Sequence, residues 1–314
     1  MALAPIAVFC YRRLNVLKQT MRALGKNHLA DKSDLFIFSD GAKSEEDAKD
    51  VQKVRDYIKT VKGFKSITII EAAKNKGLSP SIIGGVTELV NKYGKVIVIE
   101  DDIYTSPYFL KYMNDALEMY KDDEDVATIS GYRYPIKTKE ETFFLKKIEP
   151  WGWGTWKRSW KNFESDGETL LKEITEKGLM DEFTFNGTSG YDDMLNYHIQ
   201  GLCDAWDVRW YASCVLKNKL SLYPGKTLTK NIGFGVFGSI HCKTRTHSYD
   251  SKLCNREIKL KRIPLRENKD IRKQYEVFFD SLKTTGNFFI KKTRRHKERT
   301  ITILNLFKFT YHKK

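Results

Sequence analysis

The chain has 314 residues, of which 41% are hydrophobic and 30% charged, so it can bury a substantial core as one large domain or two closely joined halves. Its formal net charge is +15, no apolar stretch approaches the roughly 18 residues of a spanning helix, and the N-terminus lacks a signal peptide pattern. The five cysteines form no CxxC pair, so we expect reduced, mostly structural thiols in a cytoplasmic protein.

The first 130 residues predict alternating strands and helices. Strands are expected at the apolar runs 6–10, 35–38, 66–70, 95–99 and 127–130. The intervening segments carry apolar residues at helical spacing, and prolines open two of them. Strands that alternate with helices of this length predict right-handed βαβ crossovers and a mainly parallel sheet, which is an α/β fold.

The strand at 95–99 ends in three adjacent acids, Glu100, Asp101 and Asp102. Open α/β sheets bind ligands at the carboxyl ends of their strands, so these acids are expected at a site. Three adjacent carboxylates repel one another unless a cation or a donor-rich ligand lies among them. A hard divalent ion that holds a diphosphate is the expected occupant, and a solvated acidic loop is the alternative.

This segment, with Ile103, Pro107 and Phe109 after it, resembles the metal-binding segment of GT-A glycosyltransferases. Four further stretches resemble, in the same order, segments of the inverting N-acetylglucosaminyltransferase I; they are FCYR at 9–12, FSDG at 38–41, PWGWG at 150–154 and YDDM at 191–194. The segment 222–242 resembles a closing segment of bacterial polysaccharide (family 2-like) glycosyltransferases. The resemblance covers about residues 5–245.

The resemblance implies a GT-A, Rossmann-like fold in three parts. Residues 1–130 are expected to form a nucleotide-sugar-binding half, residues 131–265 an acceptor and catalytic half, and residues 266–314 a basic C-terminal extension. In its donor site, Mn²⁺ or Mg²⁺ at Asp102 would neutralise the leaving diphosphate of a UDP-sugar. Glu100 and Asp101 would hydrogen-bond the ribose and the donor sugar.

Four more residues receive expected roles from the resemblance. Asp40 would accept a hydrogen bond from the nucleotide base, and Arg12 would contact the nucleotide unless it is a surface arginine. His241, which follows a glycine-rich segment, is a candidate second ligand of the metal or diphosphate, or a structural histidine. Inversion needs a general base, and Asp192 is favoured over its neighbour Asp193, although Tyr191 replaces a tryptophan of the eukaryotic relative.

All six tryptophans lie between residues 151 and 210. Sugars present apolar C–H faces that stack on aromatic rings, so these residues suit an acceptor site. Trp151 and Trp153 flank Gly152 in an expected turn and are the acceptor-binding candidates. Trp206 and Trp210 are expected in the core.

The sequence therefore predicts a metal-dependent inverting glycosyltransferase, a hexosyl- or N-acetylhexosaminyltransferase. It would move a sugar from a UDP-sugar to a saccharide or lipid-linked oligosaccharide in surface polysaccharide synthesis. A sugar-nucleotide nucleotidyltransferase is one alternative, but the segment 9–13 lacks the glycine-rich phosphate loop of that class. A basic nucleic-acid-binding protein is the other, but it would not need the acid triplet, and we expect no nucleic-acid partner.

Basic residues dominate the chain from Arg256 onward. Those at 291–299 precede the apolar residues of 301–309, and two lysines end the chain. Apolar groups bracketed by cations suit an anionic membrane surface, so we expect a peripheral enzyme on the inner face of the cell membrane. A final helix packed on the catalytic domain is the alternative.

Overall fold

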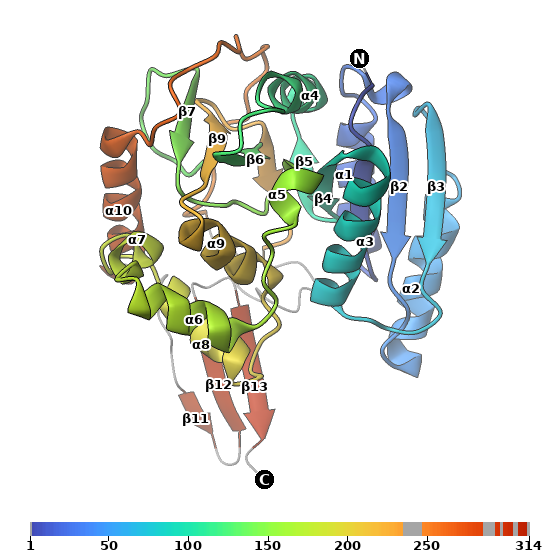
Figure 1. Cartoon of the computed structure of the whole chain (residues 1–314). Coiled ribbons are helices and arrows are strands. Elements are labelled where there is room, and N and C mark those ends of the chain that lie inside the picture. The colour runs from blue at the N-terminus through green and yellow to red at the C-terminus, as the bar shows by residue number, and fades with distance from the viewer. Residues whose placement is uncertain (1, 235–246, 285–292, 296–297, 304–306, 313–314) are drawn as a thin grey trace.

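The computed structural model describes residues 2–234, 247–284, 293–295, 298–303 and 307–312. These residues form an eight-stranded sheet with helices on both faces, and a small three-stranded sheet near the C-terminus (Figure 1). The α/β architecture with a mainly parallel sheet, as predicted from the sequence, is confirmed.

The N-terminal part of the chain contributes four adjacent parallel strands in the order β3-β2-β1-β4. They are β1 (Ile6–Cys10), β2 (Asp34–Ser39), β3 (Ser66–Glu71) and β4 (Lys95–Glu100). Each coincides with a predicted strand to within about two residues. Because the strands are parallel, their carboxyl ends lie at one edge of the sheet, and the acid triplet begins at that edge.

The sheet continues beyond β4 with strands from the second half of the chain. β8 (Trp153–Trp156) lies antiparallel between β4 and β6 (Val126–Ser130). β9 (Leu220–Pro224) pairs in parallel with β6, and β7 (Thr142–Leu145) closes the edge. The sequence predicted β6 alone among these. β8 joins the two halves of the chain within one sheet.

Side chains alternate along each strand between two cores, one on each face of the sheet. On one face, Ile6 and Val8 of β1 pack with α1 (Leu14–Leu24), α2 (Glu45–Ile58) and α4 (Phe109–Met119). The apolar residues of these helices recur at helical spacing, so each helix buries one stripe.

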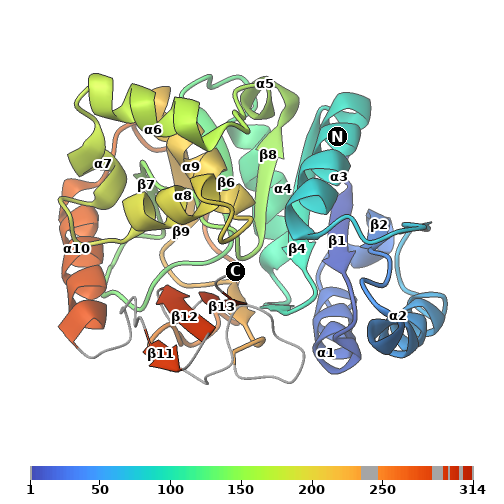
Figure 2. The ribbon, with the colours of Figure 1, turned by 90° about the horizontal axis from the view of Figure 1, so that it is seen from below.

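On the opposite face, Ala7 and Phe9 pack with α3 (Leu78–Tyr93) and α9 (Trp206–Leu216). Figure 2 shows α1 and α3 on opposite sides of β1. The remaining elements connect these layers; they are η1 (Ala30–Lys32), β5 (Ile103–Thr105), α5 (Lys157–Trp160), α6 (Gly167–Glu176), α7 (Met180–Thr184), α8 (Tyr191–Ile199) and β10 (Thr229–Asn231).

The expected C-terminal extension begins with a helix that belongs to the core. α10 (Lys269–Thr284) buries Tyr275 and its neighbours at helical spacing in the same core as α9. Three antiparallel strands follow, β11 (Thr293–Arg295), β12 (Glu298–Ile303) and β13 (Phe307–His312), in place of the final helix considered for this segment. Within the described ranges, no helix is both long and apolar enough to cross a bilayer.

Two adjacent glycines of α3 give a test of this packing. A Cβ on the exposed Gly84 would meet nothing within 4 Å, whereas one on the buried Gly85 would lie 2.7 Å from the Phe9 ring. Gly84→Ala should raise the free energy of unfolding by about 0.5–1 kcal/mol because alanine favours the helix. Gly85→Ala should lower it by about 1–3 kcal/mol because the ring must move. Urea denaturation measures both, and equal stabilities would contradict the packing of α3 against β1.

Candidate functional site

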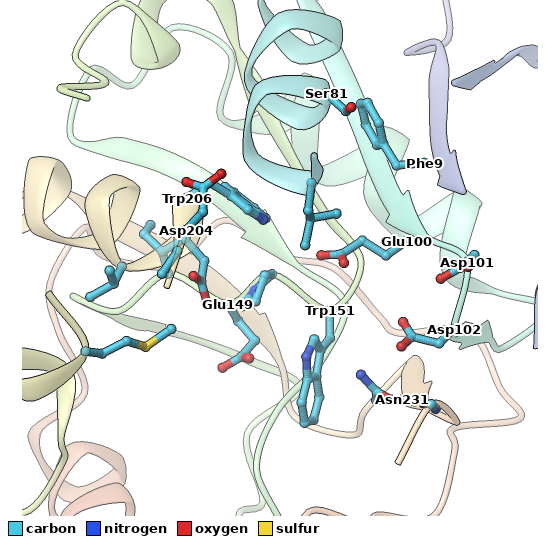
Figure 3. Close-up of a pocket in the computed structure, with 18 of the residues that line it drawn as sticks. Phe9, Ser81, Glu100, Asp101, Asp102, Glu149, Trp151, Asp204, Trp206 and Asn231 are labelled. Atoms are coloured by element: carbon cyan, nitrogen blue, oxygen red, sulfur yellow. Dashed lines mark hydrogen bonds between the residues drawn. The ribbon is translucent and has the colours of Figure 1, made fainter. Parts of the chain in front are cut away.

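A cavity of about 310 Å³ lies at the carboxyl ends of β1, β2 and β4 and extends to α8, α9 and α10 (Figure 3). This is where an open α/β sheet is expected to bind its ligand. Five of the residues singled out in the sequence line it, namely Asp40, Glu100, Asp101, Asp102 and Trp151. The remaining wall is mainly aromatic and apolar.

Arg13 holds two of the three acids that follow β4. Its Nη2 pairs with the Asp101 carboxylate and lies 2.8 Å from Asp102 Oδ2. Burial opposes the charge of this guanidinium, but the two carboxylates outweigh it and raise the pKa of Arg13. The sequence pointed to Arg12, yet Arg12 pairs with Asp47 on α2 and does not line the cavity. The structure therefore brings Arg13, and not Arg12, to the acid triplet.

The acid cluster has an excess of negative charge. Burial raises the pKa of Glu100, and the charges of Asp102 and Asp101 raise it further against the opposing effect of Arg13. Burial likewise raises the pKa of Asp101. Three carboxylates face a single guanidinium, so an additional cation would be stabilised here.

The carboxylate oxygens of the acid cluster suit a hard divalent ion that a bound small molecule also coordinates. Across the described ranges, no group of three or more His, Cys, Asp or Glu side chains forms a preformed metal site. Asp102 pairs with Arg13 through Oδ2, which leaves Oδ1 as a candidate metal ligand. Mg²⁺ and similar ions commonly bind one or two carboxylates and complete their shells with phosphate and water oxygens.

The segment that follows β10 closes over Asp102. β10 pairs with β5, and the Ile232 N–H donates to the Asp102 carbonyl at 2.9 Å. A Cβ on Gly233 would lie 2.1 Å from Asp102 Oδ2 and 2.9 Å from Arg13 Nη1. Only glycine therefore lets the backbone approach the carboxylate this closely.

Asp40 lines the cavity, but its carboxylate is occupied by the protein. It accepts hydrogen bonds of 2.8–3.0 Å from the N–H groups of Gly41, Lys76 and Gly77 and from the Asn75 side-chain amide. A carboxylate offers about four lone-pair sites, and four donors fill them. Asp40 thus fixes the turn at 75–77 at the rim of the cavity, and its position does not favour direct contact with a nucleotide base.

The two acceptor-binding candidates lie in different environments. Trp151 lines the cavity and packs edge-on against Tyr132 and Tyr249. Trp153 is fully buried in β8 and stacks on Trp206 with ring centroids 5.3 Å apart, so it cannot reach a ligand directly. Trp206 and Trp210 are both buried, as expected, although Trp206 also forms part of the cavity wall.

The candidate general bases do not face the cavity. Asp192 and Asp193 lie in the first turn of α8, and neither lines the cavity, although the adjacent Tyr191 does. His241 lies outside the described residues. The assignment of the base to Asp192 or Asp193 remains a prediction.

A buried ion pair at the far end of the cavity was not predicted from the sequence. Lys147 Nζ lies 2.8 Å from Glu149 Oε2, and the two side chains are only 2% and 3% exposed. The ammonium also lies 5.2 Å from the ring centroids of Tyr134 and Tyr191. Nothing in the sequence distinguishes Lys147 from Lys146, which reaches the surface.

A second acidic pair in the cavity wall was also missed. Asp204 precedes α9, and Asp207 lies in its first turn. Asp204 pairs with Arg209 at 3.0 Å, and its side chain is 53% exposed. Burial raises the pKa of Asp207 to about 6. In the sequence, the signal that could have revealed this pair was two aspartates on either side of a tryptophan expected in the core.

No protein-family model and no curated protein matches the sequence. Solved structures that resemble the fold include a mannosyltransferase of Pyrobaculum calidifontis in complex with GDP-Man and Mn²⁺, with 9% identity and a TM-score of 0.33 over 55% of this chain and 46% of that one. S. aureus TarS 1-349 in complex with UDP-GlcNAc shows 12% identity and a TM-score of 0.40 over 72% and 57%.

A cytidylyltransferase from Leptospira borgpetersenii shows 7% identity and a TM-score of 0.32 over 51% of this chain and 62% of that one. In these three comparisons, the alignment spans less than two thirds of the solved chain. Similarities with TM-scores this low do not assign an activity to this protein. They also do not relate it to any particular enzyme, such as N-acetylglucosaminyltransferase I.

Gly233 provides a test of the acid cluster as a metal site. Gly233→Ala should weaken Mn²⁺ binding in the presence of UDP by about fivefold or more, because displacing the Asp102 carboxylate costs about 1–3 kcal/mol. Isothermal titration calorimetry measures the affinity, and Gly84→Ala is the control because it touches nothing. Unchanged affinity in Gly233→Ala would show that Asp102 is not a ligand.

Proposed function

We propose that the protein is a metal-dependent inverting glycosyltransferase that takes its sugar from a UDP-sugar. The observation that carries this proposal is the acid cluster at the end of β4, with three carboxylates and one guanidinium, at the mouth of a cavity with an aromatic wall. Excess negative charge suits a divalent ion with a diphosphate, and aromatic faces suit sugar rings. Donor and acceptor chemistry thus meet in one cavity.

Each residue of the cluster has a distinct part in this proposal. Asp102 would hold Mn²⁺ or Mg²⁺, which when bound stabilises negative charge on the departing diphosphate. Glu100 and Asp101 would accept hydrogen bonds from the ribose and sugar hydroxyls. Arg13 keeps the two aspartates in place and offers its remaining N–H groups to phosphate oxygens.

The acceptor would enter against the aromatic wall. Trp151 presents its ring to the cavity between the acid cluster and the buried Lys147–Glu149 pair (Figure 3). We propose a saccharide or lipid-linked oligosaccharide acceptor in surface polysaccharide synthesis, with a hexosyl or N-acetylhexosaminyl group transferred.

Release of UDP from UDP-glucose, UDP-galactose, UDP-GlcNAc and UDP-GalNAc, with and without Mn²⁺, tests the proposal. A glycosyltransferase releases UDP, and slow transfer to water suffices for detection. A nucleotidyltransferase would instead form pyrophosphate from a nucleoside triphosphate and a sugar phosphate. A nucleic-acid-binding protein would do neither but would retard labelled RNA in a gel.

Asp102→Asn should lower turnover by at least about two orders of magnitude, because the leaving diphosphate loses its neutralising cation. The rate of UDP release measures this effect. Asp115→Asn is the matched control, because the Asp115 side chain is 44% exposed and pairs with Lys111 one turn away on α4. Near-normal activity with preserved Mn²⁺ dependence in Asp102→Asn would show that Asp102 is not the metal ligand.

The C-terminal sheet provides the proposed contact with membrane. Its register pairs Ile301 with Phe309 and Ile303 with Phe307, and the segment is flanked by lysines and arginines. Apolar residues that adjoin cations in the sequence suit the headgroup region of an anionic bilayer, where each cation adds about 1 kcal/mol. A lipid-linked acceptor would then be found by diffusion along the surface.

A variant that ends at Gly286 should lose binding to vesicles of phosphatidylglycerol and phosphatidylcholine. Because α10 ends at Thr284 and packs in the core, this variant should keep its fold and its Mn²⁺-dependent UDP release. Co-sedimentation measures binding, and vesicles of phosphatidylcholine alone are the control. Equal sedimentation of the full-length and shortened proteins would remove the membrane proposal.

A further inference from the structure

Asp207 lines the same cavity as the acid cluster. Figure 3 shows Asp204, Trp206 and Glu149 on one side, Asp101 and Asp102 on the other, and Glu100 between them. Asp207 follows Trp206 in the first turn of α9 and lines the same cavity. A ligand bound at the acid cluster would therefore extend toward Asp207.

The three acids on this side of the cavity differ in how they are held. Glu149 pairs with Lys147 at 2.8 Å, and Asp204 pairs with Arg209 at 3.0 Å. Among the described residues, Asp207 forms no ion pair within 4 Å, and its hydrogen bonds come from backbone N–H groups at the start of α9. Asp207 is thus the acid on this side that no cationic side chain occupies.

The electrostatic surroundings of Asp207 make it a stronger base than an ordinary aspartate. Burial raises its pKa to about 6, and the backbone N–H of Val208 and the charge of Lys147 lower it less than burial raises it. The titratable and charged groups that interact with it come from every neighbouring element; they are Glu100, Lys147, Glu149, Tyr191, Cys203 and Arg209. Asp207 and Glu100 both line the cavity, and the charge of Asp207 contributes to the raised pKa of Glu100.

We infer that Asp207 is the general base of the proposed transfer, in place of Asp192 or Asp193. The inference rests on the proposed function. The proton of the acceptor hydroxyl moves to an Asp207 carboxylate oxygen while the acceptor oxygen forms a bond to the anomeric carbon. The bond from that carbon to the diphosphate breaks, and its electron pair leaves with UDP. Asp207 then releases the proton to solvent.

The test compares Asp207→Asn with the wild-type protein in the Mn²⁺-dependent release of UDP from the UDP-sugar turned over fastest, with water or saccharide as acceptor. We expect kcat to fall by about 10²–10⁴-fold, which is the usual contribution of a positioned base. The affinity for UDP with Mn²⁺ should change by less than twofold, since the base touches the acceptor and not the nucleotide. Asp204→Asn is the matched control, three residues away, and should lose only a few-fold.

Two further readouts separate catalysis from structure. The wild-type kcat should fall as the pH drops below about 6, where Asp207 becomes protonated, and this fall should be smaller in Asp207→Asn, where Asp101 is the remaining acid of similar pKa. A carboxyl whose folded pKa is raised destabilises the fold above that pKa, so Asp207→Asn should not lower Tm at pH 7.5. A lower Tm together with lower activity would indicate a structural role and overturn the inference.

The outcomes also distinguish this inference from the proposed function. A wild-type protein that binds no UDP in the presence of Mn²⁺ would overturn the proposed function and the inference with it. A protein that binds UDP and releases it from a UDP-sugar, but for which Asp192→Asn is crippling and Asp207→Asn is mild, would overturn the inference alone.

Discussion

Crowding of like charge at the end of β4 is the physical constraint on which the site depends. Glu100, Asp101 and Asp102 leave a buried strand together, and burial raises the pKa of the first two. Arg13 relieves part of the repulsion by pairing with both aspartates. Gly233 completes the arrangement because its missing side chain lets the backbone lie against Asp102. The remaining negative charge is what a divalent ion would balance, and that ion could in turn hold a diphosphate.

The far end of the cavity also carries buried charge, but there most of the charged side chains are paired with one another. A buried ion pair costs desolvation and is stable only with good geometry and hydrogen bonds. Lys147 and Glu149 satisfy this condition, because the ammonium also donates to the Ile148 carbonyl at 2.9 Å and lies among tyrosine rings. The charges of the pair largely cancel, so Asp207 keeps the raised pKa that its burial imposes.

The sequence predicted the N-terminal part of the sheet because its signals are local. β1 to β4 are apolar runs bounded by helical patterns, and the acid triplet marks the end of β4. β7 and β8 were missed because each has four residues, and β8 (Trp153–Trp156) resembles a glycine-aromatic turn. α10 was missed as a core helix because its apolar stripe lies within a strongly basic region.

Residue roles were harder to predict than elements, because they depend on where a side chain points. Arg12 and Arg13 are adjacent, but only the start of α1 decides that Arg13 meets the acids and Arg12 meets Asp47. In the same way, only the fold decides that Lys147 is buried and that its neighbour Lys146 reaches the surface. Asp40 lines the cavity, but three of its four hydrogen bonds come from a turn 35 or more residues away in sequence, which no local pattern reveals.

Trp153 shows how a buried residue can still govern the geometry of the site. In the sheet it is paired with Val98, two residues before Glu100, and its ring stacks on Trp206, the residue before Asp207. Close-packed cores transmit displacement because they leave few voids. The position of Asp207 relative to Glu100 is therefore set through β8, which links the strand of the acid cluster to the first turn of α9. A tryptophan that no ligand touches thus holds the two sides of the cavity at a fixed separation.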